Sequence, residues 1–440
     1  MPISKGIDWV LAYPMPTRDS PTQLTPLSIM YPGAMLEAEG KGVEYWDARW
    51  DSPEMLDDLI RDADNIGVSA FTGYQTGEAA RILMRAKELK PSITTHVGGH
   101  HARLCTEDVK AEPFVDNVWP NRYYGEHLFP YSHAARRLWR RGDVQYTTSV
   151  GCPYACSFCA LRSPWSPRSI EKIEHELRIL HDDIGFTDVS FTDPNVGFER
   201  YREGGQWHRS VRIQRIGAIG RILGDLGVNW DGNIRCDYID PELVTVLADS
   251  RCVSLEFGCE SGNDHFLRKV IKKGHGVEAI RNAAECVRGS GISVMYSFIR
   301  GMPRETEDAK QDTLDLIDWI VQADSAARIS LYQYAPYPGG AAYEDAIQGV
   351  DGYSTFVPPR TMVGWGELKL MASAAYWVTG LCFRQDNTRR NFPGDDWQLI
   401  EPYVEFARQR WKERDIDNFP AEEVEVLVSR QVAKRLREVE

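Results

Sequence analysis

Long hydrophobic runs and a secretory signal are missing from this sequence of 440 residues. The longest apolar stretch lies within residues 292–299, whereas a membrane-spanning helix needs about 20 apolar residues. The first residues lack the positively charged segment and apolar core of a signal peptide. We therefore expect a soluble, cytoplasmic protein, and the length predicts about two or three domains.

Basic charge is also scarce. The chain has 51 Lys and Arg against 64 Asp and Glu, which gives a net charge of −13. Its basic clusters are short pairs such as Arg136-Arg137 and Arg140-Arg141. A nucleic-acid-binding protein needs a basic surface that replaces the counterions of phosphates. The charge therefore disfavours tRNA or DNA as a substrate, although it leaves a local basic patch open.

Cysteine is present in an odd number, nine, and its spacing does not suggest a disulfide framework. Three cysteines fall within eight residues, in the segment Cys152-Pro-Tyr-Ala-Cys156-Ser-Phe-Cys159. Three thiolates can bind three irons of a [4Fe–4S] cubane and leave the fourth iron open. The alternatives are a zinc knuckle or a chance group of free thiols. Zinc needs a fourth Cys or His at short spacing, and none follows before His175.

The first quarter of the chain alternates between strand-like and helix-like segments, which predicts a doubly wound, Rossmann-like parallel sheet. Ligands of such sheets bind beyond the carboxyl ends of the strands. Strands are expected at residues 7–12, 42–47, 66–70 and 93–97, and helices at 27–39, 53–62 and 77–89.

A second alternation of strands and helices predicts a partial (βα)6 barrel. Its strands are expected at 144–150, 189–192, 233–235, 253–258, 293–300 and 330–335, and its helices at 171–183, 211–226, 241–248, 276–288 and 307–321. The remaining residues look mainly helical. The predicted organisation is a cofactor-binding sheet domain, a connector, the barrel and a helical C-terminal domain, at 1–126, 127–143, 144–340 and 341–440.

The cysteine segment, with Phe158 before its last cysteine, resembles the signature of the radical S-adenosylmethionine (SAM) superfamily. Segments 191–195, 255–262, 297–306 and 337–340 are similar to that family's motifs on later strands. One departure is Arg304, where members of the family more often carry Gly. The resemblance implies a cluster on Cys152, Cys156 and Cys159 and SAM contacts at Phe158, Asp193, Arg235, Glu260 and Ser261. For Asp193 and Arg235, a purely structural ion pair is an equally good interpretation.

Residues 6–126 resemble the cobalamin-binding domain that is fused to many radical SAM enzymes. The resemblance implies that the corrin ring contacts Pro14, Ser69, Ala70, Phe71, Thr72, Gly73, Gly98, Gly99, His100, His101, Gly125 and Glu126. The cobalamin motif Asp-x-His-x-x-Gly is absent, so a bound cobalt would have no ligand from that motif. The alternative is a domain that kept the fold and lost the cofactor, in which His100 and His101 only shape the loop.

Together these resemblances imply a cobalamin-dependent radical SAM enzyme that methylates an unactivated carbon of a small molecule or peptide. An external electron donor such as flavodoxin or ferredoxin is then expected. Radical ring contraction, cyclisation or epimerisation is the alternative enzymatic reading. An electron-transfer module and a nucleic-acid-modifying enzyme are further alternatives, disfavoured by the SAM-type motifs and by the acidic charge respectively. The sequence identifies neither the substrate nor a catalytic side chain.

Overall fold

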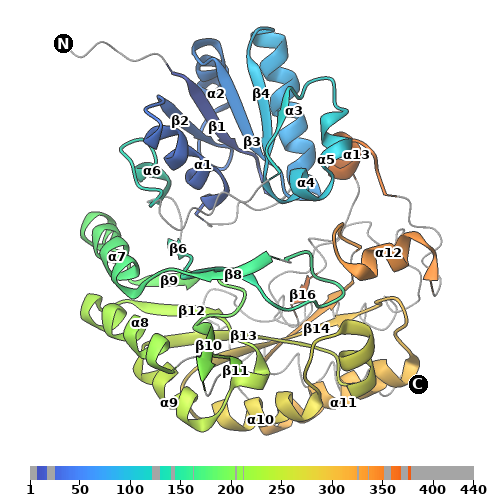
Figure 1. Cartoon of the computed structure of the whole chain (residues 1–440). Coiled ribbons are helices and arrows are strands. Elements are labelled where there is room, and N and C mark those ends of the chain that lie inside the picture. The colour runs from blue at the N-terminus through green and yellow to red at the C-terminus, as the bar shows by residue number, and fades with distance from the viewer. Residues whose placement is uncertain are drawn as a thin grey trace, which may run out of the picture. The chain divides into compact units, whose positions relative to one another are not determined.

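The computed structural model describes residues 7–16, 25–120, 129–139, 144–161, 163–203, 206–211, 213–324, 327–334, 336–350, 358–367 and 375–377. The chain divides into two compact units, which are described separately. The N-terminal unit comprises Met1–Gln145 and Val357–Ala372, and the barrel unit comprises Tyr146–Phe356 and Ser373–Glu440. Both are built from alternating strands and helices (Figure 1).

The N-terminal unit contains a five-stranded sheet in the order β2-β1-β3-β4-β5, and the four strand pairs among its described residues are all parallel. Because β1 lies between β2 and β3, the sheet has a switch point beside the end of β1, where ligands of doubly wound sheets bind. The predicted α/β fold is confirmed here. The strands are β1 (Trp9–Tyr13), β2 (Val43–Asp47), β3 (Asn65–Ser69), β4 (Thr94–Gly98) and β5 (Asn117–Val118).

The helices of this unit are α1 (Leu27–Ala38), α2 (Pro53–Asp62), α3 (Tyr74–Leu89), α4 (Gly99–Leu104), α5 (Thr106–Lys110), α6 (Arg136–Trp139) and α13 (Met362–Glu367). Helix α2 begins where the Ser52 side chain accepts a hydrogen bond from the backbone N–H of Met55 and Pro53 occupies the first turn. Helix α13 comes from far along the chain and packs on α3.

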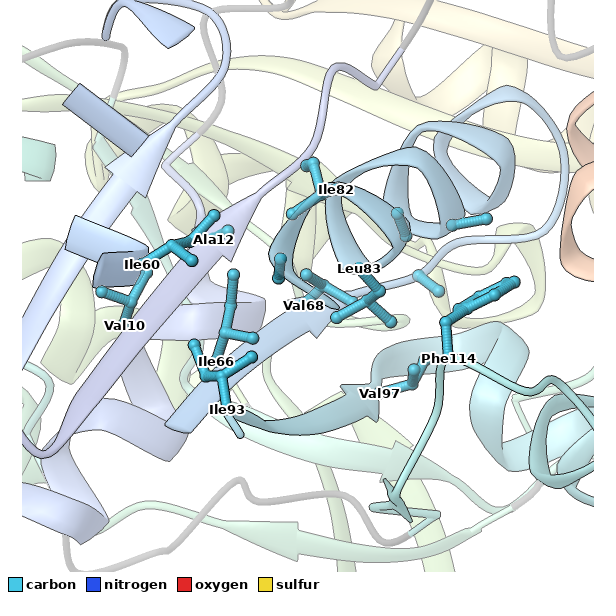
Figure 2. Packing of buried hydrophobic residues seen from close by; sticks show 14 of the residues in the cluster. Val10, Ala12, Ile60, Ile66, Val68, Ile82, Leu83, Ile93, Val97 and Phe114 are labelled. Atoms are coloured by element: carbon cyan, nitrogen blue, oxygen red, sulfur yellow. The ribbon is translucent and has the colours of Figure 1, made fainter. Parts of the chain in front are cut away.

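The core of the N-terminal unit lies between the sheet and these helices. Figure 2 shows Val10, Ile66 and Val97 of three neighbouring strands among Ile60 of α2 and Leu83 of α3. All five side chains are fully buried, and burying a residue of this size contributes about 1.5–3 kcal/mol. The core fixes the sheet and thereby the positions of the loops at its carboxyl edge.

The barrel unit contains a seven-stranded sheet in the order β16-β15-β14-β13-β12-β9-β6. Strand β16 (Ala375–Trp377) is antiparallel to β15, whereas the pairs from β9 to β15 are parallel. The predicted partial (βα)6 barrel is confirmed. Its strands are β6 (Val144–Tyr146), β9 (Asp188–Phe191), β12 (Asn229–Asn233), β13 (Cys252–Glu260), β14 (Ser293–Arg300) and β15 (Arg328–Gln333). Its helices are α7 (Ile170–Ile184), α8 (Ile213–Leu226), α9 (Pro241–Asp249), α10 (Val277–Val287), α11 (Glu307–Ala323) and α12 (Ala341–Ile347).

Two details of the barrel differ from the sequence prediction. The third strand is β12 at Asn229–Asn233 rather than residues 233–235. It carries Asn, Asp and Gly, which are depleted in strands, but Trp230 is buried and Gly232 leaves no room for a Cβ beside Val196. Two hairpins were also missed: β7 (Ser149–Cys152) with β8 (Ser163–Pro167), and β10 (Phe198–Glu203) with β11 (Gln206–Val211).

Of the predicted helical region 341–440, the structure describes 341–350, 358–367 and 375–377. The first two stretches contain α12 and α13, but the third is the unpredicted edge strand β16. Helix α13 belongs to the N-terminal unit rather than to a separate C-terminal domain. Residues 378–440, with Trp397 and Trp411, lie outside the described residues. The domain boundaries given by the sequence otherwise remain predictions.

Candidate functional site

The three clustered cysteines lie on the hairpin of β7 and β8, with Cys152 at the end of β7 and the other two on the loop that follows. The pairing of Ser149 with Pro167 and of Cys152 with Ser163 closes the base of this loop. All three thiols are free; Cys156 is 8% exposed, and Cys152 and Cys159 are half-buried. The hairpin therefore presents three thiols from one short segment, as a three-cysteine cubane requires.

Backbone contacts hold the middle of the cysteine loop from two sides. The N–H of Ser157 donates to the carbonyl of Ile271 at 2.8 Å, at the end of the π-helix η2 (Phe266–Ile271). The carbonyl of Ser157 accepts from the N–H of Ala342 at 2.9 Å. A Cβ on Gly340 would lie 2.6 Å from that same carbonyl, so glycine lets the turn after β15 approach the loop.

Aromatic and charged side chains hold the first part of the loop. The guanidinium of Arg235 lies 3.8 Å from the centre of the Tyr154 ring. It also donates to both carboxylate oxygens of Asp237, at 2.9 and 3.0 Å, and to the carbonyl of Lys273 at 2.8 Å. The hydroxyls of Tyr154 and Tyr238 are hydrogen-bonded. Arg235 therefore connects the cysteine loop to η1 (Cys236–Tyr238) and to the segment after η2.

A buried ion pair lies beside the cysteines. The Lys273 Nζ is 2.6 Å from Oε1 of Glu260, and both side chains are buried. Burial alone would lower the pKa of Lys273, but the charges of Glu260 and of the Cys156 thiolate outweigh it and raise the pKa. A Cβ on Gly258 would lie 2.6 Å from Glu260 Oε1 and 2.8 Å from Lys273 Nζ. Glycine at 258 thus makes room for the pair.

Burial and these nearby charges shift the pKa values of the thiols. Burial raises the pKa of Cys156, which Lys273 and Arg235 lower and Glu260 raises. Burial also raises the pKa of Cys159, whereas the backbone N–H of Leu161, 3.3 Å from its sulfur, lowers it. Hydrogen bonds to the sulfurs and nearby charge are the means by which a protein tunes an iron–sulfur cluster.

Asp193 is fully buried and both of its carboxylate oxygens are engaged. They accept hydrogen bonds from the N–H and hydroxyl of Thr148, at 2.8 and 2.6 Å, and from the hydroxyl of Ser149 at 2.6 Å. Burial raises the pKa of Asp193, and these hydrogen bonds together with Arg215 oppose that shift. These contacts favour the structural interpretation, in which Asp193 fixes the strand that leads into the cysteine loop.

The other predicted SAM contacts lie near the end of β13 and on the cysteine loop. Glu260 adopts a φ of +67° at the last residue of β13. Ser261 is fully buried, and its hydroxyl is 3.0 Å from that of Thr313 in α11. Phe158 is half-buried, and its backbone carbonyl lies against the space that Gly340 leaves free. Glu260 and Arg235 both act on the pKa of Cys156, whereas Ser261 is bonded to α11.

In the N-terminal unit, the predicted cobalamin loops after β3 and β4 are bonded to each other. The N–H of Ala70 donates to the carbonyl of Gly98, and the N–H of His101 donates to the carbonyl of Ala70, both at 2.9 Å. Gly99 has a φ of +91°, and a Cβ there would lie 2.7 Å from the Ala70 carbonyl oxygen. Backbone hydrogen bonds thus join the two loops into one surface at the carboxyl edge of the sheet.

Side chains of these loops divide into buried and exposed groups. His101 is fully buried, with its Nδ1 hydrogen-bonded to the hydroxyl of Thr72 at 3.1 Å. Burial and the neighbouring His100 lower the pKa of His101 to about 4. Phe71 is 52% exposed and stacks on His100 with ring centres 5.3 Å apart.

The remaining predicted cobalamin contacts are placed as follows. Ser69 is buried at the end of β3. Gly73 has a φ of +108° before α3. Pro14 follows β1, and its carbonyl accepts from the Gln75 side chain at 3.1 Å. Gly125 and Glu126 lie outside the described residues.

Comparison with known families decides the identity of both units. Residues 146–317 match the radical SAM superfamily, and residues 17–129 match the B12 binding domain. The chain therefore contains a radical SAM domain and a B12-binding domain. The radical SAM domain implies a [4Fe–4S] cluster and SAM as cofactors, and the B12-binding domain implies cobalamin.

Curated relatives match parts of this chain. An uncharacterised methyltransferase of Pyrococcus horikoshii is 26% identical over 204 residues, which are 46% of this chain and 41% of the relative. A tRNA-2-methylthio-N(6)-dimethylallyladenosine synthase of Bartonella quintana is 26% identical over 293 residues, 62% of this chain and 59% of the relative. The chain thus spans about two fifths to three fifths of these relatives.

Solved structures share the fold. The methyltransferase TsrM of Kitasatospora setae, solved with cobalamin and a [4Fe–4S] cluster, is 17% identical with a TM-score of 0.59, covering 82% of this chain and 85% of its own. The cobalamin-dependent enzyme OxsB, solved with aqua-cobalamin and SAM, is 16% identical with a TM-score of 0.59, covering 96% and 64%. Among the described helices of the present chain, none has the length and apolar character to cross a membrane.

The residues around the cysteine loop fit a cluster with a polar ligand. No group of three or more His, Cys, Asp or Glu among the described residues is arranged around a single metal ion, and a cubane instead binds each thiolate through a separate iron. Two buried polar atoms near Arg235, Asn195 Nδ2 and His275 Nε2, have no hydrogen-bond partner among the described residues. Buried polar atoms of this kind need a partner, which a bound amino-acid moiety offers.

Sequence reasoning missed Lys273, Tyr154 and Asp237. Lys273 follows Lys272 and precedes Gly274, a composition typical of an exposed turn, so its burial could not be read from the sequence. Tyr154 lies inside the cysteine motif. An aromatic residue at this position was a signal for a further contact, which the prediction of three iron ligands did not use. The missed hairpin β10–β11 had a signal in Gly204-Gly205 between two alternating segments.

Proposed function

We propose that this chain is a cobalamin-dependent radical SAM methyltransferase that acts on an unactivated carbon of a small molecule or peptide. The observation that carries the proposal is the loop with Cys152, Cys156 and Cys159, held beside the buried pair of Lys273 and Glu260. When bound, the cluster supplies the electron that cleaves SAM, and cobalamin supplies a carrier for the methyl group.

The three thiolates would hold the cluster in this proposal. Lys273 places a fixed positive charge beside Cys156, where it offsets the negative charge of the thiolates. Glu260 and Lys273 together offer one carboxylate and one ammonium, which are complementary to the amino and carboxylate groups of SAM. Because both are buried, water competes weakly for these contacts.

The paired loops after β3 and β4 would receive the corrin ring. Backbone atoms of Gly98, Gly99 and Ala70 lie at the carboxyl edge of the sheet. His101 is buried, neutral near pH 7 and bonded to Thr72. The absence of the motif Asp-x-His-x-x-Gly supports a bound cobalamin whose cobalt would have no ligand from that motif.

The substrate and partners belong to the same proposal. TsrM has also been solved with tryptophan as its substrate, which supports a small-molecule substrate for the present chain. The net charge of −13 disfavours nucleic acid. We further propose a cytoplasmic location and an external electron donor such as flavodoxin or ferredoxin.

The test is an anaerobic assay of the reconstituted full chain with reductant, hydroxocobalamin, candidate precursors and SAM labelled in its methyl group. We expect 5′-deoxyadenosine together with a labelled methyl group in the product. Formation of 5′-deoxyadenosine and a rearranged product without label would favour ring contraction, cyclisation or epimerisation. Absence of 5′-deoxyadenosine from a chain with a full cluster would contradict the enzymatic proposal.

A further inference from the structure

Helix α13 is joined to the N-terminal unit by contacts along its whole length. Before the helix, Arg360 lies 3.7 Å from the carboxylate of Asp108. At its first residue, the N–H of Met362 donates to the buried carboxylate of Glu112, and the Met362 side chain enters the core of the unit. A charge pair, a hydrogen bond and apolar packing thus all attach the start of α13 to this unit.

The end of α13 meets α3 backbone to backbone. A Cβ built on Gly366 would lie 2.3 Å from the Cα of Gly77, and one built on Gly77 would lie 2.8 Å from the Cα of Gly366. Neither helix can carry a side chain at this crossing without moving apart. Glycine at both positions therefore sets how closely α13 approaches α3.

This approach places Trp365 against His101, a member of the predicted cobalamin surface. The two rings meet edge to face with centres 5.5 Å apart, and both side chains are buried. Within the part of the chain that the structure describes, the Nε2 of His101 and the Nε1 of Trp365 have no hydrogen-bond partner. On its other side, His101 is bonded to Thr72 through Nδ1 and to Ala70 through its backbone N–H.

We propose that α13 is part of the cobalamin site, and that Trp365 is a positioning residue that holds His101 and the paired loops in the shape that receives the corrin ring. The inference rests on the proposed function and adds a segment more than 200 residues away from the B12-binding match. It also assigns His101 a role in loop shape rather than in binding cobalt. The pKa of His101, about 4, agrees with a neutral ring enclosed by Trp365.

The test measures hydroxocobalamin binding by equilibrium dialysis and iron per chain on the same anaerobic preparations of the full-length protein. We expect Trp365→Ala and Gly366→Ala each to raise the Kd for hydroxocobalamin by about tenfold or more, equivalent to about 1.4 kcal/mol. Iron content should stay at the parental level, because the cysteine loop belongs to the other unit. Trp365→Phe should restore the Kd to within about threefold, since it keeps an aromatic edge against His101.

Gly224→Ala is the matched control for Gly366→Ala, because a Cβ at this glycine of α8 would meet nothing within 4 Å. His101→Asn should also raise the Kd for hydroxocobalamin, whereas the cobalamin that it does bind should have the absorption spectrum of the parent. A changed spectrum would show that His101 binds cobalt and would overturn its assigned role. Parental affinity in both Trp365→Ala and Gly366→Ala, or joint loss of iron and cobalamin, would overturn the specific role of α13. If the parent chain binds no hydroxocobalamin, the cobalamin part of the proposed function fails and this inference fails with it.

Discussion

The two candidate sites are held together by different kinds of interaction. The cysteine loop of the barrel is fixed by buried charges and aromatic rings, with Arg235 against Tyr154 and Lys273 against Glu260. The loops at the carboxyl edge of the N-terminal sheet are fixed by backbone hydrogen bonds, by glycines and by a neutral histidine. Each construction suits the proposed ligand, since a cluster and SAM are small and charged whereas the corrin of cobalamin is broad and edged by neutral amide groups.

This difference determines which substitutions should matter at each site. Removing one member of a buried charge pair leaves the other uncompensated, so changes of charge should be costly at the cysteine loop. A backbone-paired surface contains few charges to lose, so changes of volume should be costly at the N-terminal loops. The predictions below test this contrast, beginning with the largest expected effect.

Replacing Cys152, Cys156 or Cys159 by Ala should abolish SAM cleavage, because three thiolates are needed to hold the cubane. We expect the parent to hold about four irons per chain after anaerobic reconstitution and each variant to lose most of them. Hydroxocobalamin binding should be unchanged if the two sites are independent. Cys286→Ala is the control, since Cys286 lies on α10 outside the loop. Normal SAM cleavage by any one of the loop variants would contradict the assignment of the cluster.

The architecture was readable from the sequence wherever the hydrophobic pattern was strong. Strand β14 has the predicted bounds, Ser293–Arg300, and it is mostly buried, apolar and β-branched or aromatic. Strand β12 was misplaced because its Asn, Asp and Gly residues resemble a turn, whereas the neighbouring strands force them into a sheet. Local propensity is overridden in this way when tertiary pairing supplies the missing stability.

The site was readable only in part. The cysteine motif identified the three thiols, because their spacing alone brings them together. Lys273 and Trp365 could not be found in this way, since each meets its partner through the fold: Lys273 meets Glu260 13 residues away, and Trp365 meets His101 from α13. Arg304 was noted as a departure from the family pattern, and the structure gives it a φ of +68°, where glycine is favoured.

Lys273→Met should lower the free energy of unfolding by about 3–5 kcal/mol, the typical effect of removing one partner of a buried ion pair. The Glu260 carboxylate would remain buried without its counter-charge. Denaturant unfolding of the full chain without added cofactors measures this effect. Lys310→Met, which breaks an ion pair with the exposed Glu307, should cost less than about 1 kcal/mol. Equal losses of unfolding free energy in the two variants would show that the buried pair stabilises the fold no more than the exposed pair does.

Gly99→Ala should disturb the N-terminal loops through volume and backbone conformation. The added Cβ would lie 2.7 Å from the Ala70 carbonyl oxygen, at a φ of +91°. We expect a loss of stability of about 1–3 kcal/mol and a Kd for hydroxocobalamin at least about tenfold higher, or about 1.4 kcal/mol. Gly40 has a similar φ of +81°, and a Cβ there would meet nothing within 4 Å among the described residues. Gly40→Ala therefore measures the free-energy cost of the backbone conformation without steric overlap. Unchanged binding in Gly99→Ala would mean that this loop does not shape the cobalamin site.

Arg235→Lys should have the smallest effect, and it separates the two interpretations of this residue. Lysine keeps the positive charge but loses the two-pronged bond to Asp237 and the flat stacking on Tyr154. If Arg235 positions the cysteine loop, the variant should shift the midpoint potential and the EPR signal of the reduced cluster, while the Kd for SAM changes by less than about threefold, or about 0.7 kcal/mol. If Arg235 instead contacts SAM, the Kd should rise while the cluster signal without SAM stays parental. Arg178→Lys, in an exposed ion pair on α7, is the control and should change neither quantity.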